Sequence, residues 1–405
     1  MNVVMVLFKD ILYDARVQRE AIALAEGGYQ VTIFCVKEHE KTLPSLHGNI
    51  VIRRLALFTK SAKMKMNGSG TATSSRKVNM IKAIVRSPMI KLVKEVAVTK
   101  AFYNKIKQSL SNQNVDVIHC HDLNTLPIGH WLSKDKEAKL IYDSHELYNE
   151  MAGRTAFDQK IGYKLERSLM KKIDHLIVVN PYVKAEFETR YGQVPTTVIQ
   201  NIPLVEKAKL VEELSKNYWR EKFNLTDDDI ILIYQGGMNP NRGIEDCIQA
   251  LKELPDHYKL VLLGEGTIKQ NLVDAVLQLG LSARVFFHDQ VPSADILWYT
   301  KQADIGLVMY QNNSLNNYLS TPNKIFEYLL AGIPMVASNH PGKSYIIEPE
   351  EIGICVEESP AEIKRGIEYI MENYDFYKET CRKKRTLITW EEEGQKLVNA
   401  YKSLS

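Results

Sequence analysis

The sequence has no paired cysteines and no long apolar run. Its five cysteines lie far apart and come to an odd number, which does not suggest a disulfide framework. A reducing compartment fits best. No run of about 18 apolar residues is present to span a bilayer. The first residues, MNVVMVLFKD, lack the basic leader and long apolar stretch of a secretory signal. These absences predict a cytoplasmic protein.

A dinucleotide fingerprint is also missing. In parallel α/β proteins, ligands bind just beyond the carboxyl ends of the strands. The first strand-like run, VVMVLF, is followed by FKDILYDAR, which contains no G-x-G-x-x-G pattern. This argues against an oxidoreductase that uses a nicotinamide dinucleotide.

The composition is that of an ordinary globular enzyme. Hydrophobic residues make up 45% and charged residues 25% of the 405 residues, which excludes a disordered or collagen-like chain. The length exceeds what one hydrophobic core usually fills, so two domains are expected.

Strand-length apolar runs alternate with helix-length segments along the whole chain. The run VVMVLF is followed by a predicted helix, Ala15–Glu26, which Asp14 can cap and Gly27 can end, and then by the run QVTIFCV. Further strand-like runs of the first half are VDVIH, KLIYD and HLIVVN. The alternation restarts at IILIYQ, after a segment that carries Pro195 and Pro203, and continues with KLVLLGEG, VFFHD, ADIGLVMY and PMVAS. We therefore expect an α/β protein with two doubly wound parallel sheets, divided near residue 203.

Positive charge is concentrated in one segment. Between Lys60 and Lys107 there are twelve Lys or Arg residues against a single acid, Glu95. A solvated basic face and a surface for anionic membrane both explain this pattern. Nucleic acid binding is not expected, because no aromatic stacking pattern or known reader motif accompanies the charge.

Two stretches of the second half place polar residues after a strand. Gly236 and Gly237 follow IILIYQ and would let the backbone approach a ligand, while Arg242 at the next helix start could meet a diphosphate. A tight turn with an exposed arginine is the alternative. Further on, STPNK leads into a predicted helix, Asn323–Ala331, that carries Glu327, a carboxylate able to accept from both hydroxyls of a ribose. Alternatively, Glu327 only favours the helix dipole.

Titratable residues also follow two strands of the first half. The strings VDVIHCHD and KLIYDSHE are expected to aim them into one cleft. A zinc site from His119, Cys120 and His121 is possible but poorly spaced, and one of the two histidines is expected to face away from the cleft. The residues concerned are His119, Cys120, His121, Asp122, Asp143, His145 and Glu146.

These strings together resemble the family-4 retaining glycosyltransferases of the GT-B fold. The strongest likeness is STPNKIFEYLLAGIPMVAS, which is similar to the family's donor-site motif. HCHDLNTLPIG, YDSHE and DARVQREAIALAEGGYQV are similar to first-domain signatures of a bacterial branch that builds surface polysaccharides. The resemblance implies two Rossmann-like domains that face each other across a cleft. Residues 1–203 would bind the acceptor and residues 204–387 the nucleotide-sugar donor, and a final helix at 388–405 would pack back on the first domain.

The resemblance also implies roles for single residues. Arg242 falls where the family has a basic diphosphate ligand, and Glu327 where it has the ribose ligand. His121 would lie near the reacting sugar. The family's second basic residue falls on Gly237, and its Glu eight residues before Glu327 falls on Leu319. The expected donor-binding residues are Gly236, Gly237, Arg242, Asn323, Lys324 and Glu327, and the expected acceptor-side residues are Arg16, Asp122, His145 and Glu146.

The resulting prediction is a retaining hexosyltransferase of cell-surface polysaccharide synthesis. It would take a nucleoside diphosphate sugar and a glycan or lipid-linked acceptor, need neither metal nor cofactor, and lie in the cytoplasm or peripherally on the inner face of the membrane. Arg242, Lys324 and the backbone amides at Asn323 would stabilise the leaving group. The asparagines before Leu319 would hold the sugar, or alternatively only solvate a surface loop; they are Asn312, Asn313, Asn316 and Asn317. An epimerase or phosphorylase of the same fold, or a non-catalytic partner subunit, are the alternatives.

Overall fold

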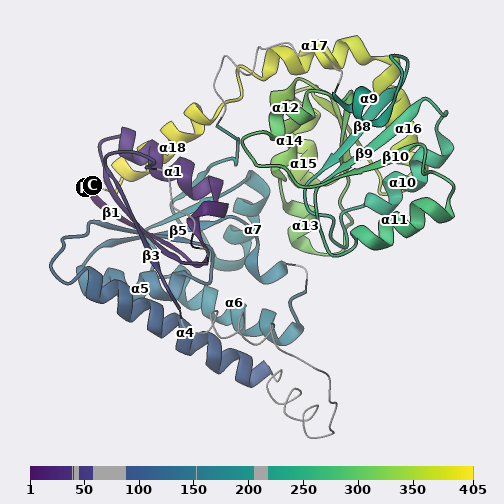
Figure 1. Cartoon of the computed structure of the whole chain (residues 1–405). Coiled ribbons are helices and arrows are strands. Elements are labelled where there is room, and N and C mark those ends of the chain that lie inside the picture. The colour runs from purple at the N-terminus through teal and green to yellow at the C-terminus, as the bar shows by residue number, and fades with distance from the viewer. Residues whose placement is uncertain (39, 41–44, 58–87, 152, 205–217, 405) are drawn as a thin grey trace, which may run out of the picture. The chain divides into compact units, whose positions relative to one another are not determined.

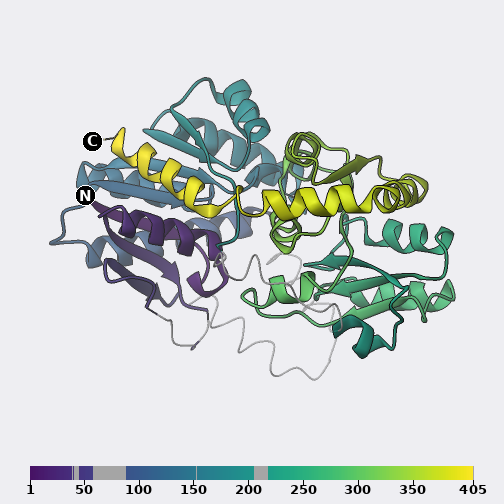
Figure 2. The ribbon, with the colours of Figure 1, turned by 90° about the horizontal axis from the view of Figure 1, so that it is seen from above.

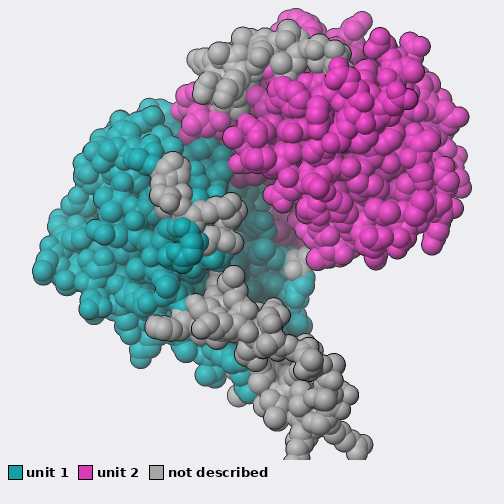
Figure 3. Space-filling model, in the orientation of Figure 1, with its two compact units in different colours: residues 1–200, 393–405 teal, residues 201–392 magenta. Residues whose placement is uncertain are grey.

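The chain forms two compact units. The computed structural model describes residues 1–38, 40, 45–57, 88–151, 153–204 and 218–404. Unit 1 comprises Met1–Gln200 and Glu393–Ser405, and unit 2 comprises Asn201–Glu392 (Figure 3). The boundaries expected after residues 203 and 387 lie a few residues from these. The expected loop between Ser61 and Ser75, and the basic residues from Lys60 to Arg86, fall outside the described residues.

Unit 1 is built on a seven-stranded parallel sheet with the order β3-β2-β1-β4-β5-β6-β7. The apolar runs that the sequence analysis picked out form five of these strands. The two edge strands, β3 and β7, were not expected, because β3 carries two arginines and β7 has three residues. The strands are β1 (Asn2–Leu7), β2 (Gln30–Val36), β3 (Ile50–Leu55), β4 (Val117–His121), β5 (Lys139–Ser144), β6 (His175–Val178) and β7 (Thr196–Val198).

Helices cover both faces of this sheet (Figure 1). On one face α1 lies beside α18, as Figures 1 and 2 show, and a Cβ at Gly27 would touch Val398. On the other face α5 packs on β4 and β5, and Tyr142 of β5 contacts α6 and α7. The helices are α1 (Ala15–Glu26), α4 (Pro88–Ser109), α5 (Leu126–Lys136), α6 (Ala156–Met170), α7 (Pro181–Tyr191) and α18 (Trp390–Lys402), with 3-10 turns η1 (Ile11–Tyr13) and η2 (Tyr148–Glu150).

Helix α1 begins and ends at the residues that the sequence predicts. The Asp14 carboxylate accepts from the Val17 backbone N–H, and Gly27 is the C-cap residue. Most of the helix face toward the sheet is apolar, but Arg16 and Glu20, one turn apart, are buried there too. Since buried charges are costly unless they are paired, this face of the sheet must supply partners for them.

Unit 2 contains a six-stranded parallel sheet with the order β10-β9-β8-β11-β12-β13. All of its strands except β13 were expected. The strands are β8 (Ile230–Gln235), β9 (Tyr258–Leu263), β10 (Val285–His288), β11 (Ile305–Val308), β12 (Met335–Ser338) and β13 (Gly353–Val356). The helices are α9 (Tyr218–Phe223), α10 (Ile244–Glu253), α11 (Lys269–Gln278), α12 (Ile296–Thr300), α13 (Leu315–Leu319), α14 (Asn323–Ala331), α15 (Pro341–Ile347), α16 (Pro360–Glu372) and α17 (Tyr374–Lys384).

The sheet of unit 2 separates two apolar cores. One core packs α10, α11 and α16 against the sheet, and the other packs α9, α12, α14 and α15 against the opposite face. Helix α14 spans the residues that the sequence predicts, and Gly332, with φ of 73°, ends it. The doubly wound architecture expected from the sequence is therefore present in both units.

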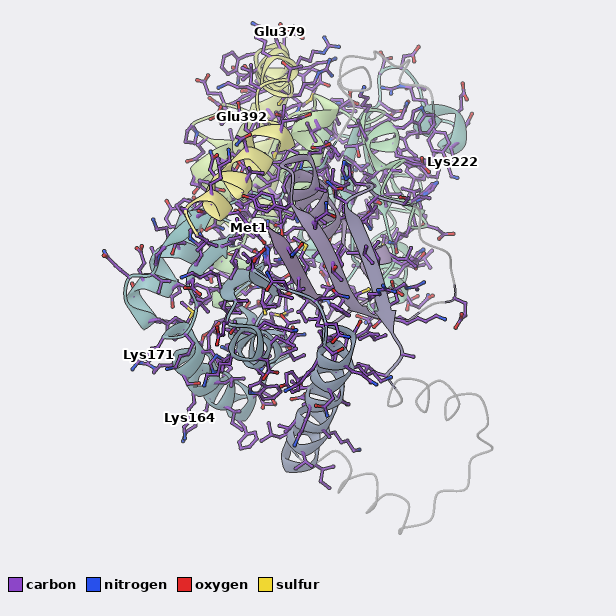
Figure 4. The ribbon with its side chains drawn as sticks, turned by 90° about the vertical axis from the view of Figure 1, so that its left-hand side faces the viewer. Met1, Lys164, Lys171, Lys222, Glu379 and Glu392 are labelled. Carbon is purple, nitrogen blue, oxygen red and sulfur yellow. The ribbon has the colours of Figure 1, made fainter. Side chains whose placement is uncertain are left out.

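Charged side chains lie at the surface of both units. Figure 4 shows Lys164 on α6, Lys171 at the C-cap of α6 and Lys222 on α9 extending away from the ribbon. Across the described ranges, no helix combines the length and the apolar character needed to cross a bilayer.

Candidate functional site

Unit 2 gathers polar groups at the carboxyl end of β8. Gly236, directly after the strand, has φ of 116°, a conformation that favours glycine, and Gly264 approaches its carbonyl so closely that a Cβ there would collide with it. The Tyr234 hydroxyl donates to the Gly237 carbonyl at 2.9 Å and fixes the turn. A Cβ at Gly237 would meet only the side-chain amide of Asn239. Gly236 is therefore required by the backbone, whereas Gly237 is not.

Two cations lie next to this turn. Arg242 precedes Gly243, the N-cap residue of α10, and its Cζ lies 4.5 Å from the centroid of the Tyr310 ring. Lys324 is buried, with its Nζ 3.7 Å from the centroid of the Tyr234 ring. Burial, together with the charge of Arg242, lowers the pKa of Lys324 to about 7. An anion bound here would favour the charged lysine.

Glu327 lies one turn into α14 and is held by a chain of hydrogen bonds. The Gln235 side-chain amide donates to Glu327 Oε2 at 2.5 Å, and the Thr300 hydroxyl donates to Gln235 Oε1 at 2.7 Å. Glu327 is half-buried. Its orientation is thus fixed from β8 and α12.

The N-terminus of α14 adds backbone donors. Pro322, the N-cap residue, provides no capping side chain, and the Asn323 side-chain oxygen accepts from Asn201 at 2.7 Å. First-turn amides of a helix attract anions, because they point outward at the positive end of the helix dipole. Gly236, Gly237, Arg242, Lys324 and Glu327 therefore surround a position suited to a nucleoside diphosphate.

The asparagine loop before Leu319 is largely occupied with its own structure. The Asn317 side-chain amide donates to the Gln311 carbonyl at 3.3 Å and to Asn313 Oδ1 at 3.1 Å. Leu319 is buried at the end of α13, and a Cβ at Gly342 would collide with its carbonyl. The Asn317 amide thus stabilises the loop, and a sugar contact by Asn316 stays a prediction.

In unit 1, the side chains after β4 and β5 converge on Asp143. Its Oδ2 lies 3.0 Å from His145 Nε2, 3.3 Å from His121 Nδ1 and 3.6 Å from His119 Nε2. His119 and Asp143 are fully buried, and the second ring nitrogen of His119 lies 2.7 Å from the Tyr401 hydroxyl of α18. The cluster therefore joins two strands to the C-terminal helix.

Arg16 of α1 balances the buried acids of this cluster. Its guanidinium lies 3.1 Å from Asp143 Oδ1 and 2.9 Å from Glu20 Oε1, and it donates to the Ile199 carbonyl at 3.0 Å. Burial would raise the pKa of Asp143, but the charges of Arg16 and His145 outweigh it and keep that pKa well below its usual range. Burial raises the pKa of Glu20 to about 8. At neutral pH the cluster holds an ionised Asp143 beside a protonated Glu20.

The two other histidines differ in charge. Burial opposes a charged His145, but Asp143 and Asp122 outweigh it and raise its pKa to about 10. Burial, with the neighbouring His119, lowers the pKa of His121 to about 3. Asp122, whose φ is 65°, accepts from the His145 backbone N–H at 3.2 Å, whereas Glu146 is exposed. His121 is thus a neutral ring beside a cationic one.

The expectation that one of the two histidines faces away was wrong. His119 and His121 are two residues apart on one strand, so their side chains point to the same face, and their rings stack with centroids 4.4 Å apart. Cys120 points to the opposite face, toward Gly129 of α5. A zinc site that combines His119, Cys120 and His121 is therefore not formed.

A different set of donors does converge here. One ligand atom each from Glu20, His119, His121 and Asp143 lie within 4.8 Å of one another. However, the Arg16 guanidinium already contacts both carboxylates, and His145 supplies a second positive charge. The ionised Asp143 is thus balanced by the chain's own cations, and Glu20, with its raised pKa, carries little charge at neutral pH. Sequence reasoning missed Glu20 and Tyr401; the spacing of Glu20 four residues after Arg16 could have indicated it.

Two family models together match most of the chain. Residues 15–202 match Glycosyltransferase Family 4, and residues 215–386 match Glycosyl transferases group 1. The Bacillus subtilis chain named glycosyltransferase EpsD is 27% identical over 298 residues, covering 70% of this chain and 73% of that one. A second B. subtilis relative, TuaH, named for teichuronic acid biosynthesis, is 23% identical over 52% of this chain and 53% of its own.

A solved structure shares the fold over the full length. The Anabaena protein HepE, in complex with UDP, is 14% identical and matches with a TM-score of 0.72 over 100% of both chains. Both units thus have counterparts in this structure, and each unit matches its own glycosyltransferase model. The chain belongs to the glycosyltransferases of the GT-B fold, with a family 4 domain followed by a group 1 domain.

Proposed function

We propose that this chain transfers a hexosyl residue from a nucleoside diphosphate sugar to a glycan or lipid-linked acceptor, with retained anomeric configuration, in cell-surface polysaccharide synthesis. Unit 2 binds the donor and unit 1 the acceptor. The observation that carries the donor half is the set of Arg242, Lys324 and Glu327 around the N-terminus of α14. The UDP in the HepE structure and the name of TuaH support the donor class and the pathway.

The proposed chemistry is electrostatic. The leaving group is a nucleoside diphosphate, whose charge grows as the bond to the sugar breaks. Arg242, Lys324 and the first amides of α14 are placed to stabilise that charge, so we propose that transfer needs no metal ion. The acceptor hydroxyl would lose its proton late, toward the donor phosphate. His121, neutral because of its burial, would then orient the sugar and need not act as a strong base.

The proposal is tested first by binding and then by turnover. Nucleoside diphosphates should raise the melting temperature, since a ligand at a hundredfold its Kd adds about 2.7 kcal/mol. A panel of nucleotide sugars with lipid-linked and glycan acceptors should then show sugar transfer that EDTA does not reduce. Donor turnover without an acceptor would instead favour the epimerase or phosphorylase. Binding without any turnover would favour a non-catalytic subunit, with Gly237 and Leu319 as its explanation.

Substitution of Glu327 tests the ribose contact. Glu327→Gln keeps the size of the side chain and an oxygen that can accept from the Gln235 amide. It replaces the carboxylate, which is proposed to accept hydrogen bonds from both ribose hydroxyls, with a neutral amide. Losing a charge-assisted hydrogen bond should weaken nucleoside and nucleoside diphosphate binding alike, by about 1.5–3 kcal/mol. Isothermal titration measures both affinities. Unchanged affinity in a folded variant would contradict the assignment.

Exposed residues of helix α4 allow the expected membrane contact to be tested. Val93 and Val96 are 66% and 55% exposed, and Lys94 and Lys100 are exposed beside them. We expect the chain to sediment with anionic vesicles at low salt, with a loss of about 1 kcal/mol for each lysine in Lys94→Ala/Lys100→Ala. As a control, Lys222→Ala/Lys383→Ala removes two exposed lysines of unit 2. Vesicle binding that depends neither on the charge of the lipid nor on the salt concentration would contradict this contact.

A further inference from the structure

Three cations of unit 2 surround one aromatic ring. Tyr310 follows β11 and is 7% exposed, and its backbone N–H donates to Ser338 Oγ at the end of β12. The ring centroid lies 4.5 Å from Arg242 Cζ, 4.9 Å from Lys343 Nζ and 5.5 Å from Lys324 Nζ. Tyr310 thus holds three positive side chains that come from three different segments.

Lys343, which the sequence analysis did not single out, is fully buried on α15. Its Nζ donates to the Asn317 carbonyl at 2.7 Å and to the Ser320 carbonyl at 3.4 Å, and it lies 3.2 Å from His340 Nδ1. The ammonium therefore fixes the last residues of α13 and the start of the segment that leads into α14.

A second contact between α15 and this segment supports the same arrangement. The Thr321 hydroxyl donates to the Gly342 carbonyl at 2.6 Å, one residue before the N-cap Pro322. The position of the α14 N-terminus, with its amides and Lys324, is consequently set by α15.

The charges of this group are unbalanced. Nearby carboxylates balance the two lysines only in part: Glu327 raises the pKa of Lys324 and Glu358 that of Lys343, yet both pKa values stay below that of an ordinary lysine. Burial lowers the pKa of Lys343 to about 7 and Arg242 adds to this effect, while Cys355 and Glu358 oppose it. Near neutral pH the two lysines are therefore only partly charged, because burial and mutual repulsion oppose their charged forms and a ring face offsets only part of that cost. A bound polyanion would offset the rest.

We propose that Tyr310 and Lys343 are positioning residues of the donor diphosphate site: Tyr310 holds Arg242 and Lys324 toward the diphosphate, and Lys343 fixes the approach to α14 while adding positive charge. Lys343 thereby compensates for the basic residue that is absent at Gly237. This inference rests on the proposed donor site.

The test compares matched variants of the full chain by isothermal titration with inorganic pyrophosphate. It also uses whichever of UDP, GDP and ADP binds the wild type most tightly, together with the corresponding nucleoside. Tyr310→Phe keeps the ring and should bind pyrophosphate within about twofold of wild type. Tyr310→Leu loses the ring face and should bind about five- to tenfold more weakly. Lys343→Met should weaken binding by about tenfold or more, and the surface control Lys364→Met should not.

The nucleoside separates positioning from general damage. Its affinity should stay unchanged in Tyr310→Leu and Lys343→Met, because the inferred role concerns the diphosphate alone. Equal losses for nucleoside and nucleoside diphosphate, or equal pyrophosphate affinity in Tyr310→Leu and wild type, would overturn the inference. Circular dichroism shows whether Lys343→Met folds. If it does not, the comparison of Tyr310→Phe with Tyr310→Leu in pyrophosphate binding tests the inference by itself. A wild type that binds neither pyrophosphate nor any nucleoside diphosphate would overturn the proposed donor site together with this inference.

Discussion

Asp143→Asn should destabilise unit 1 by about 3–5 kcal/mol, because it removes the partner of two buried cations. Asp143 lies 3.1 Å from Arg16 and 3.0 Å from His145, and all of its side chain is buried. The asparagine keeps the shape but removes the ionised acid between the guanidinium and the imidazolium, and ionisation of Glu20 would restore a partner to Arg16 alone. Scanning calorimetry should show the melting temperature of unit 1 falling by about 2–4 °C for each kcal/mol.

A surface carboxylate of the same unit provides the control. Glu188 of α7 pairs with Lys184 at 3.8 Å, and both side chains are more than a third exposed. Glu188→Gln should change the stability of unit 1 by less than about 0.5 kcal/mol. A similarly small effect of Asp143→Asn would contradict the view that Asp143 is the centre of the cluster.

The same variant should alter the pH dependence of stability. In the folded chain the pKa of Glu20 is raised to about 8, above that of an ordinary glutamate. Between about pH 5 and 8 the folded state therefore binds a proton that the unfolded state has lost, and Glu20 makes stability fall as the pH rises. Without Asp143, Arg16 should draw Glu20 into its ionised form. The fall in melting temperature of unit 1 across this pH range should become shallower in Asp143→Asn than in wild type.

The fold could be predicted largely because local and long-range signals agree. The α14 helix has a proline before its first residue and a glycine after its last, and an apolar stripe between them, so sequence and structure give the same bounds. Strand β3 was not predicted because it is an edge strand that is only partly buried, and two arginines interrupt its run of apolar residues. Apolar runs reveal the central strands of parallel sheets better than the edge strands: β3, β7 and β13 were missed, whereas the edge strand β10 was found by its run VFFH.

The candidate sites were predictable where a residue follows a strand or falls in a string that resembles the family's motifs, and not where only packing brings a helix residue to the site. Gly236 and Asp122 directly follow strands. Lys343, in contrast, is an ordinary lysine in the sequence, and only the packing of α15 against α13 shows that it is buried. The error about His119 and His121 had a different cause. Side chains two residues apart on a strand point to the same face, whereas the prediction placed these two on opposite faces.

Arg242→Ala should weaken nucleoside diphosphate binding by about 1.5–3 kcal/mol, or about ten- to a hundredfold, while leaving nucleoside binding nearly unchanged. Arg242 is the most exposed of the three cations around Tyr310, and it stands at the start of α10 beside the glycine turn. A guanidinium there can donate two parallel hydrogen bonds to phosphate oxygens, which an ammonium cannot reproduce. Arg242→Lys should therefore recover only part of the lost affinity.

Arg365, a 73% exposed arginine of α16, provides the control, and Arg365→Ala should leave both affinities unchanged. Because the diphosphate is also the leaving group of the proposed reaction, sugar transfer by Arg242→Ala should stay slow even at saturating donor. Normal turnover under those conditions would show that Arg242 binds the ground state alone. Equal losses of nucleoside and nucleoside diphosphate affinity would place the arginine away from the phosphates.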